Sequence, residues 1–341
     1  DMTSQYCAEA PGKLFLLGEY AVLDGSPAIV AAVEPKVRVV AGYKGTRQKL
    51  SIAIPSSGVH FTADVRSLPP TGPGPVAFVL ACCASCPEEE RRTVLPGLNL
   101  VIEFPRTQGV HAKLGLGGSA ALVASVSALL FELAHGRGRA QQHKTEVFHR
   151  ALAAHRAAQQ GRGSGADVAA SVFGGLILFE TSNGSAPRVE LLPWPENLAL
   201  ATSWSGQPAS TAELIGTYYN SVRDHAALHR QFLRSSALAV ETFATAIRSC
   251  SDAESAWRAA APVLLEFAPK LRLPYLTPAL ARILALAQSQ NIVAKPSGAG
   301  GGDSAVALCR PDQKAALIEL WERSGFPCPA VSPAKEGVVC G

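Results

Sequence analysis

Two glycine-rich segments have the composition of anion-binding loops. The first, KLGLGGSAA at residues 113–121, leads directly into an apolar segment with helical spacing. The second, KPSGAGGGD at residues 295–303, lies between two short apolar strands. Glycines let backbone N–H groups converge on one anion, and a helix N-terminus adds unpaired N–H groups and the positive end of its dipole. The first segment therefore predicts a phosphate site, and the second is either a flexible turn or, as its flanking strands favour, a rigid loop.

Three polar side chains are candidates for chemistry beside these loops. Ser119 stands where the helix begins, so its hydroxyl either caps the helix or contacts a magnesium ion. Lys13 opens an apolar strand and is either a solvated strand end or faces a site, because a buried lysine is costly unless it is paired. Asp167 follows two glycines in GSGAD and either caps a helix or orients an acceptor group. A Lys–Asp pair beside a phosphate loop predicts phosphoryl transfer, since the lysine stabilises charge on the transferred group.

Two other nucleotide-binding motifs are excluded. Neither loop matches the P-loop pattern G-x-x-x-x-G-K-[ST]. Gly115, Gly117 and Ala120 do match the dinucleotide pattern G-x-G-x-x-A, which requires a strand directly before the loop and an acidic residue at the end of the next strand. The preceding strand, 98–104, ends too early, and the acidic residue at the right distance, Glu132, falls inside a helix. A nicotinamide-dependent enzyme is therefore not expected.

Composition sets the broad class of the protein. The 341 residues are 48% hydrophobic and 17% charged, and the formal net charge is +4. Because single cores stop growing at roughly 250–300 residues, the length predicts two domains. The scattered, weak positive charge predicts no nucleic-acid partner. Of eight cysteines, Cys83 and Cys86 form a lone C-x-x-C without a second pair, so we expect reduced thiols rather than a zinc site.

The remaining patterns predict location and fold class. No targeting signal precedes Cys7 and no apolar run reaches the ~18 residues of a membrane span, so we expect a cytoplasmic protein without a membrane partner. Strands and helices are mixed without regular βα alternation, which favours an α+β fold. The Asn-, Gly-, Ser- and Pro-containing stretch at 183–195 predicts a domain connection, with domains at 1–190 and 191–341. Helices are expected at 76–85, 119–134, 145–160, 214–248, 276–289 and 315–324, and strands at 28–40, 50–54, 98–104, 174–180, 198–204, 292–295 and 305–309.

Three segments resemble the signature motifs of the GHMP kinases in their amino-acid sequences and in their order along the chain. They are PGKLFLLGEYAVL at 11–23, KLGLGGSAA at 113–121 and KPSGAGGGDSAVAL at 295–308. The resemblance spans nearly the whole chain. It implies a two-domain α+β fold, with an N-terminal domain like domain 2 of ribosomal protein S5 and a ferredoxin-like C-terminal domain. It also implies ATP and Mg²⁺ as cofactors, in a monomer or a homodimer.

The resemblance assigns roles residue by residue. Lys13 and Asp167 correspond to catalytic positions, and Ser119 corresponds to the serine that contacts magnesium. The implied ATP-binding residues are Lys113, Gly115, Leu116, Gly117, Gly118, Ser119 and Ala120. Two departures stand out. Gly118 replaces the first serine of the usual second motif, and no acidic residue lies between Glu146 and Asp167, where mevalonate kinases carry a magnesium-binding glutamate.

Within the family, three stretches look like those of phosphomevalonate kinases: 154–167 (AHRAAQQGRGSGAD), 204–211 (WSGQPAST) and 295–303. The implied acceptor is 5-phosphomevalonate. Its implied contacts are Lys13, Tyr20, Lys113, Ser164, Ser210, Ser297, Gly298 and Ala299, with Lys113, Arg162 and Lys295 as cations beside the loops. Mevalonate kinase is the alternative enzyme, and a non-catalytic sugar sensor of the same fold is the alternative from another class. The adenine contacts have no fixed pattern, and we expect them near 56–72.

Overall fold

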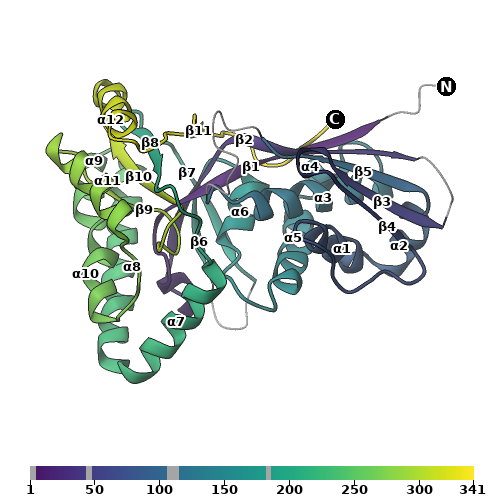
Figure 1. Cartoon of the computed structure of the whole chain (residues 1–341), viewed down its shortest axis with the longest axis horizontal. Helices are drawn as coiled ribbons and strands as arrows, with labels where there is room; N and C mark the ends of the chain where they lie inside the picture. Colours follow the sequence, from purple (N-terminus) through teal and green to yellow (C-terminus); the bar gives the residue numbers. More distant parts are fainter. Residues whose placement is uncertain (1–4, 44–47, 106–114, 182–185) are drawn as a thin grey trace.

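Two long antiparallel strands, β1 (Tyr6–Leu17) and β2 (Ala28–Tyr43), run through the larger sheet of this computed structural model (Figure 1). The structure describes residues 5–43, 48–105, 115–181 and 186–341. The other strands of this sheet are β3 (Lys49–Ile54), β4 (Val59–Asp64), β5 (Leu98–Glu103), β6 (Leu176–Glu180), β7 (Arg188–Leu192), β11 (Ser332–Pro333) and β12 (Val339–Cys340). The strand order is β12-β1-β2-β5-β3-β4, β2 also pairs with β6 and β11, and β7 pairs with β6.

The first half of β2 is buried on both faces. Ala28 and Val30 belong to one hydrophobic core, whereas Ile29, Ala31 and Val33 belong to a second core on the opposite face. Successive side chains of a strand point to opposite faces, so a strand covered on both sides needs apolar residues at every position. The unbroken apolar run that begins β2 is thus the sequence of a strand held between two layers.

The first core is built around a single central helix. It lies between the sheet and helices α1 (Val76–Ser85), α3 (Gly118–His135), α5 (Lys144–Ala158) and α6 (Ala166–Phe173). α3 has 18 residues with a mean hydropathy of 1.4, so by length and composition it is long enough to cross a membrane, and the expectation that no apolar run has this length was wrong. In the fold, 72% of α3 is buried, as in a core helix. Two shorter helices, α2 (Glu88–Val94) and α4 (Arg139–Gln142), complete this layer.

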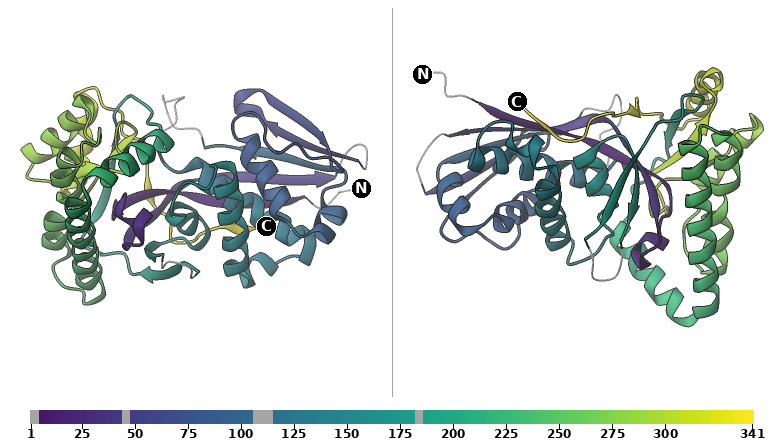
Figure 2. Two further views of the ribbon diagram at one scale, coloured as in Figure 1. Left: turned by 90° about the horizontal axis from the view of Figure 1, so that it is seen from below. Right: turned by 180° about the vertical axis from the view of Figure 1, so that it is seen from behind.

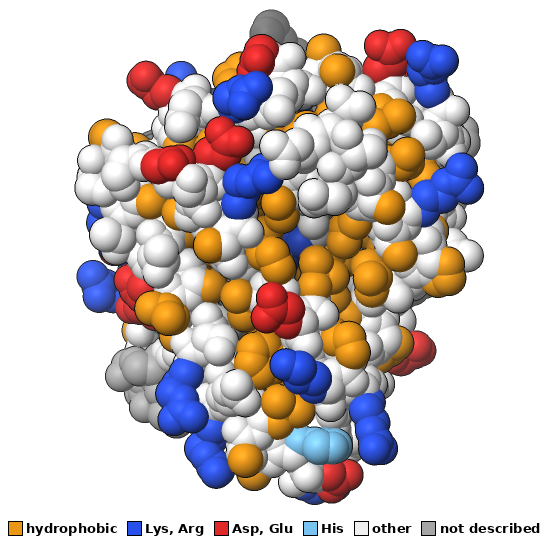
Figure 3. All heavy atoms as spheres, turned by 90° about the vertical axis from the view of Figure 1, so that its left-hand side faces the viewer, with side chains coloured by type: hydrophobic (Ala, Val, Ile, Leu, Met, Phe, Trp, Pro, Cys, Tyr) orange, Lys and Arg blue, Asp and Glu red, His pale blue; other side chains and the backbone are white. Residues whose placement is uncertain are grey.

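The second sheet lies at the other end of the molecule (Figures 1 and 2). Its antiparallel strands are β8 (Ala199–Trp204), β9 (Ala294–Pro296) and β10 (Ser304–Cys309), in the order β8-β10-β9. The helices of this end are α7 (Thr211–Asp224), α8 (Ala226–Arg248), α9 (Ala253–Ala260), α10 (Val263–Lys270), α11 (Pro278–Ser289) and α12 (Pro311–Arg323). Two 3₁₀ helices, η1 (Ala21–Asp24) and η2 (Pro55–Ser57), belong to the first half of the chain. At the end of the molecule that carries the second sheet, hydrophobic side chains gather over the centre of the outer face, among scattered charged ones (Figure 3).

The mixed α+β architecture agrees with the expectation from sequence, but the prediction for the stretch 183–195 was wrong. β7 lies inside the stretch 183–195 that was expected to be a connection, and it extends the larger sheet by pairing with β6. Pro and Gly near this short strand give the whole stretch the composition of a loop, so the strand is not recognised from the sequence. The domain limits 1–190 and 191–341 stay a prediction. The end of the chain crosses that division, since β11 pairs with β2 and β12 pairs with β1.

Candidate functional site

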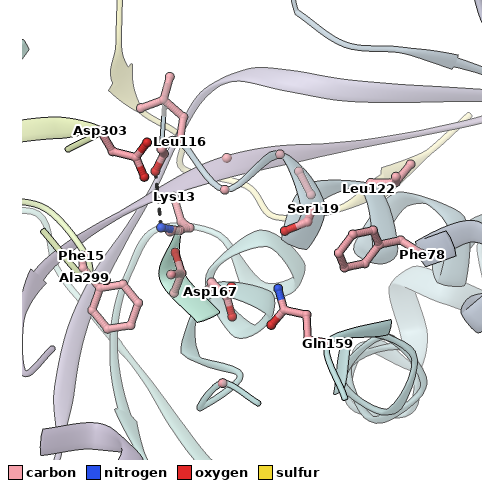
Figure 4. A pocket seen from close by; sticks show the side chains of 18 of the residues that line it. Lys13, Phe15, Phe78, Leu116, Ser119, Leu122, Gln159, Asp167, Ala299 and Asp303 are labelled. Carbon is pink, nitrogen blue, oxygen red and sulfur yellow. Dashed lines mark hydrogen bonds between the residues drawn. The ribbon is translucent and has the colours of Figure 1, made fainter. Parts of the chain in front are cut away.

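A cavity of about 1490 Å³ brings the three signature segments together (Figure 4). It is lined by β1, by the first glycine loop, by the start of α6 and by the second glycine loop. Most of the residues that the sequence predicts for the site line it. They are Lys13, Tyr20, Gly115, Leu116, Gly117, Gly118, Ser119, Ser164, Asp167, Ser210, Ser297, Gly298 and Ala299. Ala120 is fully buried in α3, and Lys113 lies outside the described residues.

The first glycine loop is held between two charged side chains. A Cβ atom added to Gly117 would lie 2.6 Å from Lys13 Cγ, and one added to Gly115 would lie 2.6 Å from Asp303 Cβ. Gly115 and Gly117 have positive φ values of 72° and 75°, respectively, which other residues rarely adopt. Lys13 Nζ donates to Gly115 O at 3.4 Å, and Lys13 N donates to Leu116 O at 2.8 Å. Glycine is therefore required here for close approach as well as for backbone conformation.

Lys13 itself lies inside β1, not at the start of a strand as expected. Its backbone is paired with Ala32 of β2 on one side and bonded to Leu116 O of the glycine loop through its N–H, and its ammonium lies 5.6 Å from the centre of the Phe15 ring. Figure 4 shows its side chain crossing below the glycine loop, with its end in the cavity.

Ser119 is not the N-cap of α3. The helix begins one residue earlier, its N-cap is Gly117, and the cap makes no side-chain hydrogen bond. Ser119 therefore stands in the first helical turn, and its Oγ lies 3.3 Å from Nε2 of His155. Figure 4 shows the Ser119 side chain pointing into the cavity.

Asp167 occupies the first turn of α6, whose N-cap is Gly165. Its Oδ1 accepts a hydrogen bond from Val168 N at 2.9 Å, and its Oδ2 lies 3.8 Å from His155 Nε2. Just before the helix, Ser164 Oγ accepts a hydrogen bond from Ala166 N at 3.2 Å. The end of α5 and the start of α6 thus fix the carboxylate at the cavity wall.

The second glycine loop is rigid, because side chains of both halves of the chain hold it. Ser297 Oγ donates to Phe15 O at 3.0 Å, and Tyr20 OH donates to Ala299 O at 2.6 Å. Tyr20 has a φ of 62°, which is uncommon for a bulky residue, and burial raises the pKa of its phenol. Gly298 has open space around it and faces the cavity.

Lys295 was expected to be a cation beside the loops, and this was wrong. Only 1% of its side chain is exposed, and its Nζ forms an ion pair with Glu19 and donates to Pro296 O at 2.8 Å. Burial lowers the pKa of Lys295, and the Glu19 carboxylate opposes that shift. Glu19 Oε1 also accepts from Gly298 N at 3.3 Å, so the pair ties the second loop to the end of β1. The expectation failed because the sequence does not show which carboxylate will be buried beside a lysine.

Sequence reasoning missed one residue that lines the cavity and one that lies behind it. Asp303 lines it, accepts a hydrogen bond from Ala209 N through Oδ1 at 3.0 Å, and so fixes the segment before Ser210. His155 touches both Ser119 and Asp167. The available signal for His155 was its place 12 residues before Asp167, in the stretch noted only for its lack of acidic residues.

The donors around Ser119 suit a magnesium ion held mainly by nucleotide phosphates. Among the described residues, no three His, Cys, Asp or Glu side chains form a metal-ligand group. Mg²⁺ prefers oxygen ligands, keeps several waters and is commonly bound by one or two protein oxygens plus substrate phosphates. The Ser119 hydroxyl supplies such an oxygen, and the Asp167 carboxylate lies beside it, with both groups within 3.8 Å of His155 Nε2.

Comparison with known proteins gives consistent matches. Family models for the GHMP kinases N terminal domain and the GHMP kinases C terminal match residues 79–175 and 245–325. The phosphomevalonate kinase of Streptomyces sp. (strain CL190) is 31% identical, over 96% of this chain and 97% of the relative. The mevalonate kinase of Pyrococcus furiosus is 28% identical, over 94% of each chain.

Solved structures share the fold at lower identity. Streptococcus pneumoniae phosphomevalonate kinase in complex with phosphomevalonate and AMPPNP superposes with a TM-score of 0.77 at 19% identity, covering 96% of this chain and 99% of that one. A Listeria innocua protein superposes with a TM-score of 0.85 at 21% identity, covering 99% of both chains.

Proposed function

The chain belongs to the GHMP kinase family, and from this premise we propose that it transfers the γ-phosphoryl group of ATP to 5-phosphomevalonate, giving ADP and 5-diphosphomevalonate. The observation that carries the proposal is the single cavity in which Lys13, the first glycine loop and Asp167 meet the second glycine loop and Ser210. The full-length similarity to a phosphomevalonate kinase supports the choice of acceptor.

The ATP phosphates are assigned to the first glycine loop. Residues 115–118 and the N-terminus of α3 present backbone N–H groups and the positive end of the helix dipole to the cavity. Mg²⁺ would be held by Ser119 Oγ together with phosphate oxygens, and when bound it neutralises charge on those phosphates. The base of the nucleotide is assigned to the cavity wall formed by Ser56, Ser57 and the ring of Phe78.

The acceptor phosphate is assigned to the opposite wall, formed by Ser164, Ser210 and Gly298. Arg162 also lines the cavity and supplies a guanidinium, a group that binds phosphate through two parallel hydrogen bonds. Lys13 stabilises negative charge on the transferred group. An acceptor oxygen attacks the γ-phosphorus, the bond to the β–γ bridging oxygen breaks, and ADP leaves with that oxygen.

The role of the Asp167 carboxylate depends on whether the acceptor is a phosphate or an alcohol. The second pKa of a phosphate monoester is about 6, so its oxygens are largely deprotonated near neutral pH. A strong general base is therefore less necessary than for an alcohol. We assign Asp167 to orientation and electrostatics rather than to proton removal.

Mevalonate kinase is the second candidate. Mevalonate kinases that cover 94% of this chain at 26–28% identity favour it. The stretch between Glu146 and Asp167 argues against it, because this stretch contains no acidic residue to serve as a second magnesium ligand.

The deciding experiment measures ADP release from ATP and Mg²⁺ with 5-phosphomevalonate, mevalonate, galactose or homoserine as acceptor. Turnover with 5-phosphomevalonate alone supports the proposal. Turnover with mevalonate instead keeps the family and replaces the acceptor. The absence of turnover with all four contradicts the proposal and favours a sensor of the same fold.

A further inference from the structure

We infer that His155 is a positioning residue that fixes the Ser119 hydroxyl and the Asp167 carboxylate relative to each other. The inference rests on the proposed function for the reaction that it affects, while its geometry stands on the contacts of three side chains.

His155 has a fixed, buried position behind Ser119 and Asp167, which line the cavity. It lies on α5 near the end of the helix, and only 3% of its side chain is exposed. Its ring packs against the ring of Phe78, with the centroids 5.5 Å apart and an angle of 34° between the planes. A ring packed in this way cannot reorient without displacing its neighbours, so its nitrogen atoms occupy defined points.

One nitrogen of His155 reaches both functional groups. Nε2 lies 3.3 Å from Ser119 Oγ and 3.8 Å from Asp167 Oδ2. Ser119 belongs to the first turn of α3 and Asp167 to the first turn of α6, so this contact joins two helices that start at the cavity. A buried polar nitrogen is costly without a partner, and Ser119 provides that partner.

The contact controls the direction of the hydroxyl. Ser119 Oγ donates to Nε2 if the imidazole carries its proton on Nδ1, and it accepts from Nε2–H in the other tautomer. In either case rotation of the hydroxyl is restricted, and the remaining lone pairs of Oγ are aimed at the cavity. A misplacement of about 1 Å in a reacting group can cost 10²-fold in rate, so loss of this contact is expected to slow turnover.

The test compares His155→Gln with His155→Met. The two replacements have similar length and volume, but only Gln carries polar atoms that can reach the position of Nε2. We expect His155→Met to lower kcat by about 10–100-fold with KM for ATP changed less than about threefold, and His155→Gln to recover most of kcat. Melting temperatures are measured for both. His149→Met, at an exposed position of the same helix, is the matched control and should behave as wild type.

Coupling to Ser119 separates positioning from packing. In a Ser119→Ala background, the further loss caused by His155→Met should shrink to less than about threefold, because the contact is already gone. Equal kcat for the Gln and Met variants would overturn the inference. So would full additivity with Ser119→Ala, or a loss of activity that simply follows the melting temperature.

A readout without turnover distinguishes this inference from the proposed function. The ¹⁵N chemical shift of His155 Nε2 in the apoprotein should change in Ser119→Ala, since a hydrogen-bond partner is removed. If no acceptor is turned over but this shift changes, the proposed function fails and the geometry stands. An unchanged shift overturns the inference whatever the acceptor.

Discussion

Lys13 and Asp167 bring opposite charges into one cavity, but a phosphate acceptor demands more of the lysine than of the aspartate. The lysine faces charge that develops on the transferred group, and a preorganised donor of this kind is worth about 10²–10³ in kcat. The aspartate would face an acceptor oxygen that has already lost its proton near neutral pH. The two substitutions should therefore differ in effect.

We predict that Lys13→Met lowers kcat by about 10²–10³-fold, whereas Asp167→Asn stays within about tenfold of wild type. Steady-state ADP release at pH 7.5 with 5-phosphomevalonate measures both. A loss in Asp167→Asn as large as that in Lys13→Met would show that the carboxylate removes a proton.

The three clustered cysteines should be inert in the folded protein. Cys82 and Cys83 belong to α1 and Cys86 is the C-cap of that helix; all three are buried, and burial raises the pKa of the Cys82 and Cys86 thiols to about 12 and about 11. Because the thiolate is the reactive form, we predict slow labelling by iodoacetamide at pH 8 and fast labelling of the exposed Cys250. Peptide mass spectrometry before and after urea denaturation measures this. Fast native labelling at 82–86 would contradict the burial.

At the scale of single residues, the sequence predicts which side chains line the cavity better than it predicts which side chains contact each other. The glycines and Ser119 are recognisable because a phosphate loop needs those residue types in that order. Lys295 was misjudged because its role depends on Glu19, which is 276 residues away. His155 was missed because its role depends on Ser119, which is 36 residues away.

Among the elements, the first glycine loop depends on an approach that a methyl group would block. We predict that Gly117→Ala lowers kcat/KM for ATP by at least about tenfold, because its Cβ would displace Lys13. Gly138→Ala is the matched control. Gly138 has a similar φ of 78° but open space around it, so it shares only the backbone cost of about 1–2 kcal/mol. Similar kinetics in the two variants would mean that strain alone matters.

The buried ion pair between β1 and the second loop makes a stability prediction. Removing one partner of such a pair leaves an uncompensated charge and costs about 3–5 kcal/mol, so Lys295→Met should unfold at a markedly lower urea concentration. The double variant Lys295→Met/Glu19→Gln should regain part of the loss.

Arg323→Met provides the control for that pair. It breaks an exposed i,i+4 pair with Glu319 and should change stability by less than about 1 kcal/mol. If Lys295→Met destabilised the protein no more than Arg323→Met does, the Lys295–Glu19 pair would contribute as little to stability as an exposed ion pair.

Elements with strong periodicity or an unbroken apolar run were predictable, whereas β7 was not. α1 occurs at the predicted residues, and α3, which apolar spacing and bounding glycines define, differs by one residue at each end. β7 was hidden by its loop-like surroundings, and its place in the sheet depends on pairing with β6. Pairing between distant segments is a tertiary property that local composition does not encode.

For the whole molecule, the return of the chain end to the larger sheet should matter for stability more than for catalysis. Deleting residues 331–341 removes β11, β12 and the buried Val338, and none of the residues that line the cavity in the described part of the chain. We predict a melting temperature lower by several degrees and a KM for ATP within about twofold of wild type below that temperature.

Val338→Ala separates the two causes of that loss. It removes one buried side chain and keeps the strand pairing, so it should be milder than the deletion. A large increase in KM for ATP in the deletion variant would instead place the chain end in control of the site.

The pairing of β12 with β1 also bears on how the protein is made. On the ribosome, the edge of β1 that receives residues 339 and 340 emerges long before its partner, which is synthesised more than 300 residues later. At 5–20 residues per second, this edge waits roughly 15–60 s for its partner. During that time it exposes unpaired backbone groups, which are a template for association with other nascent chains.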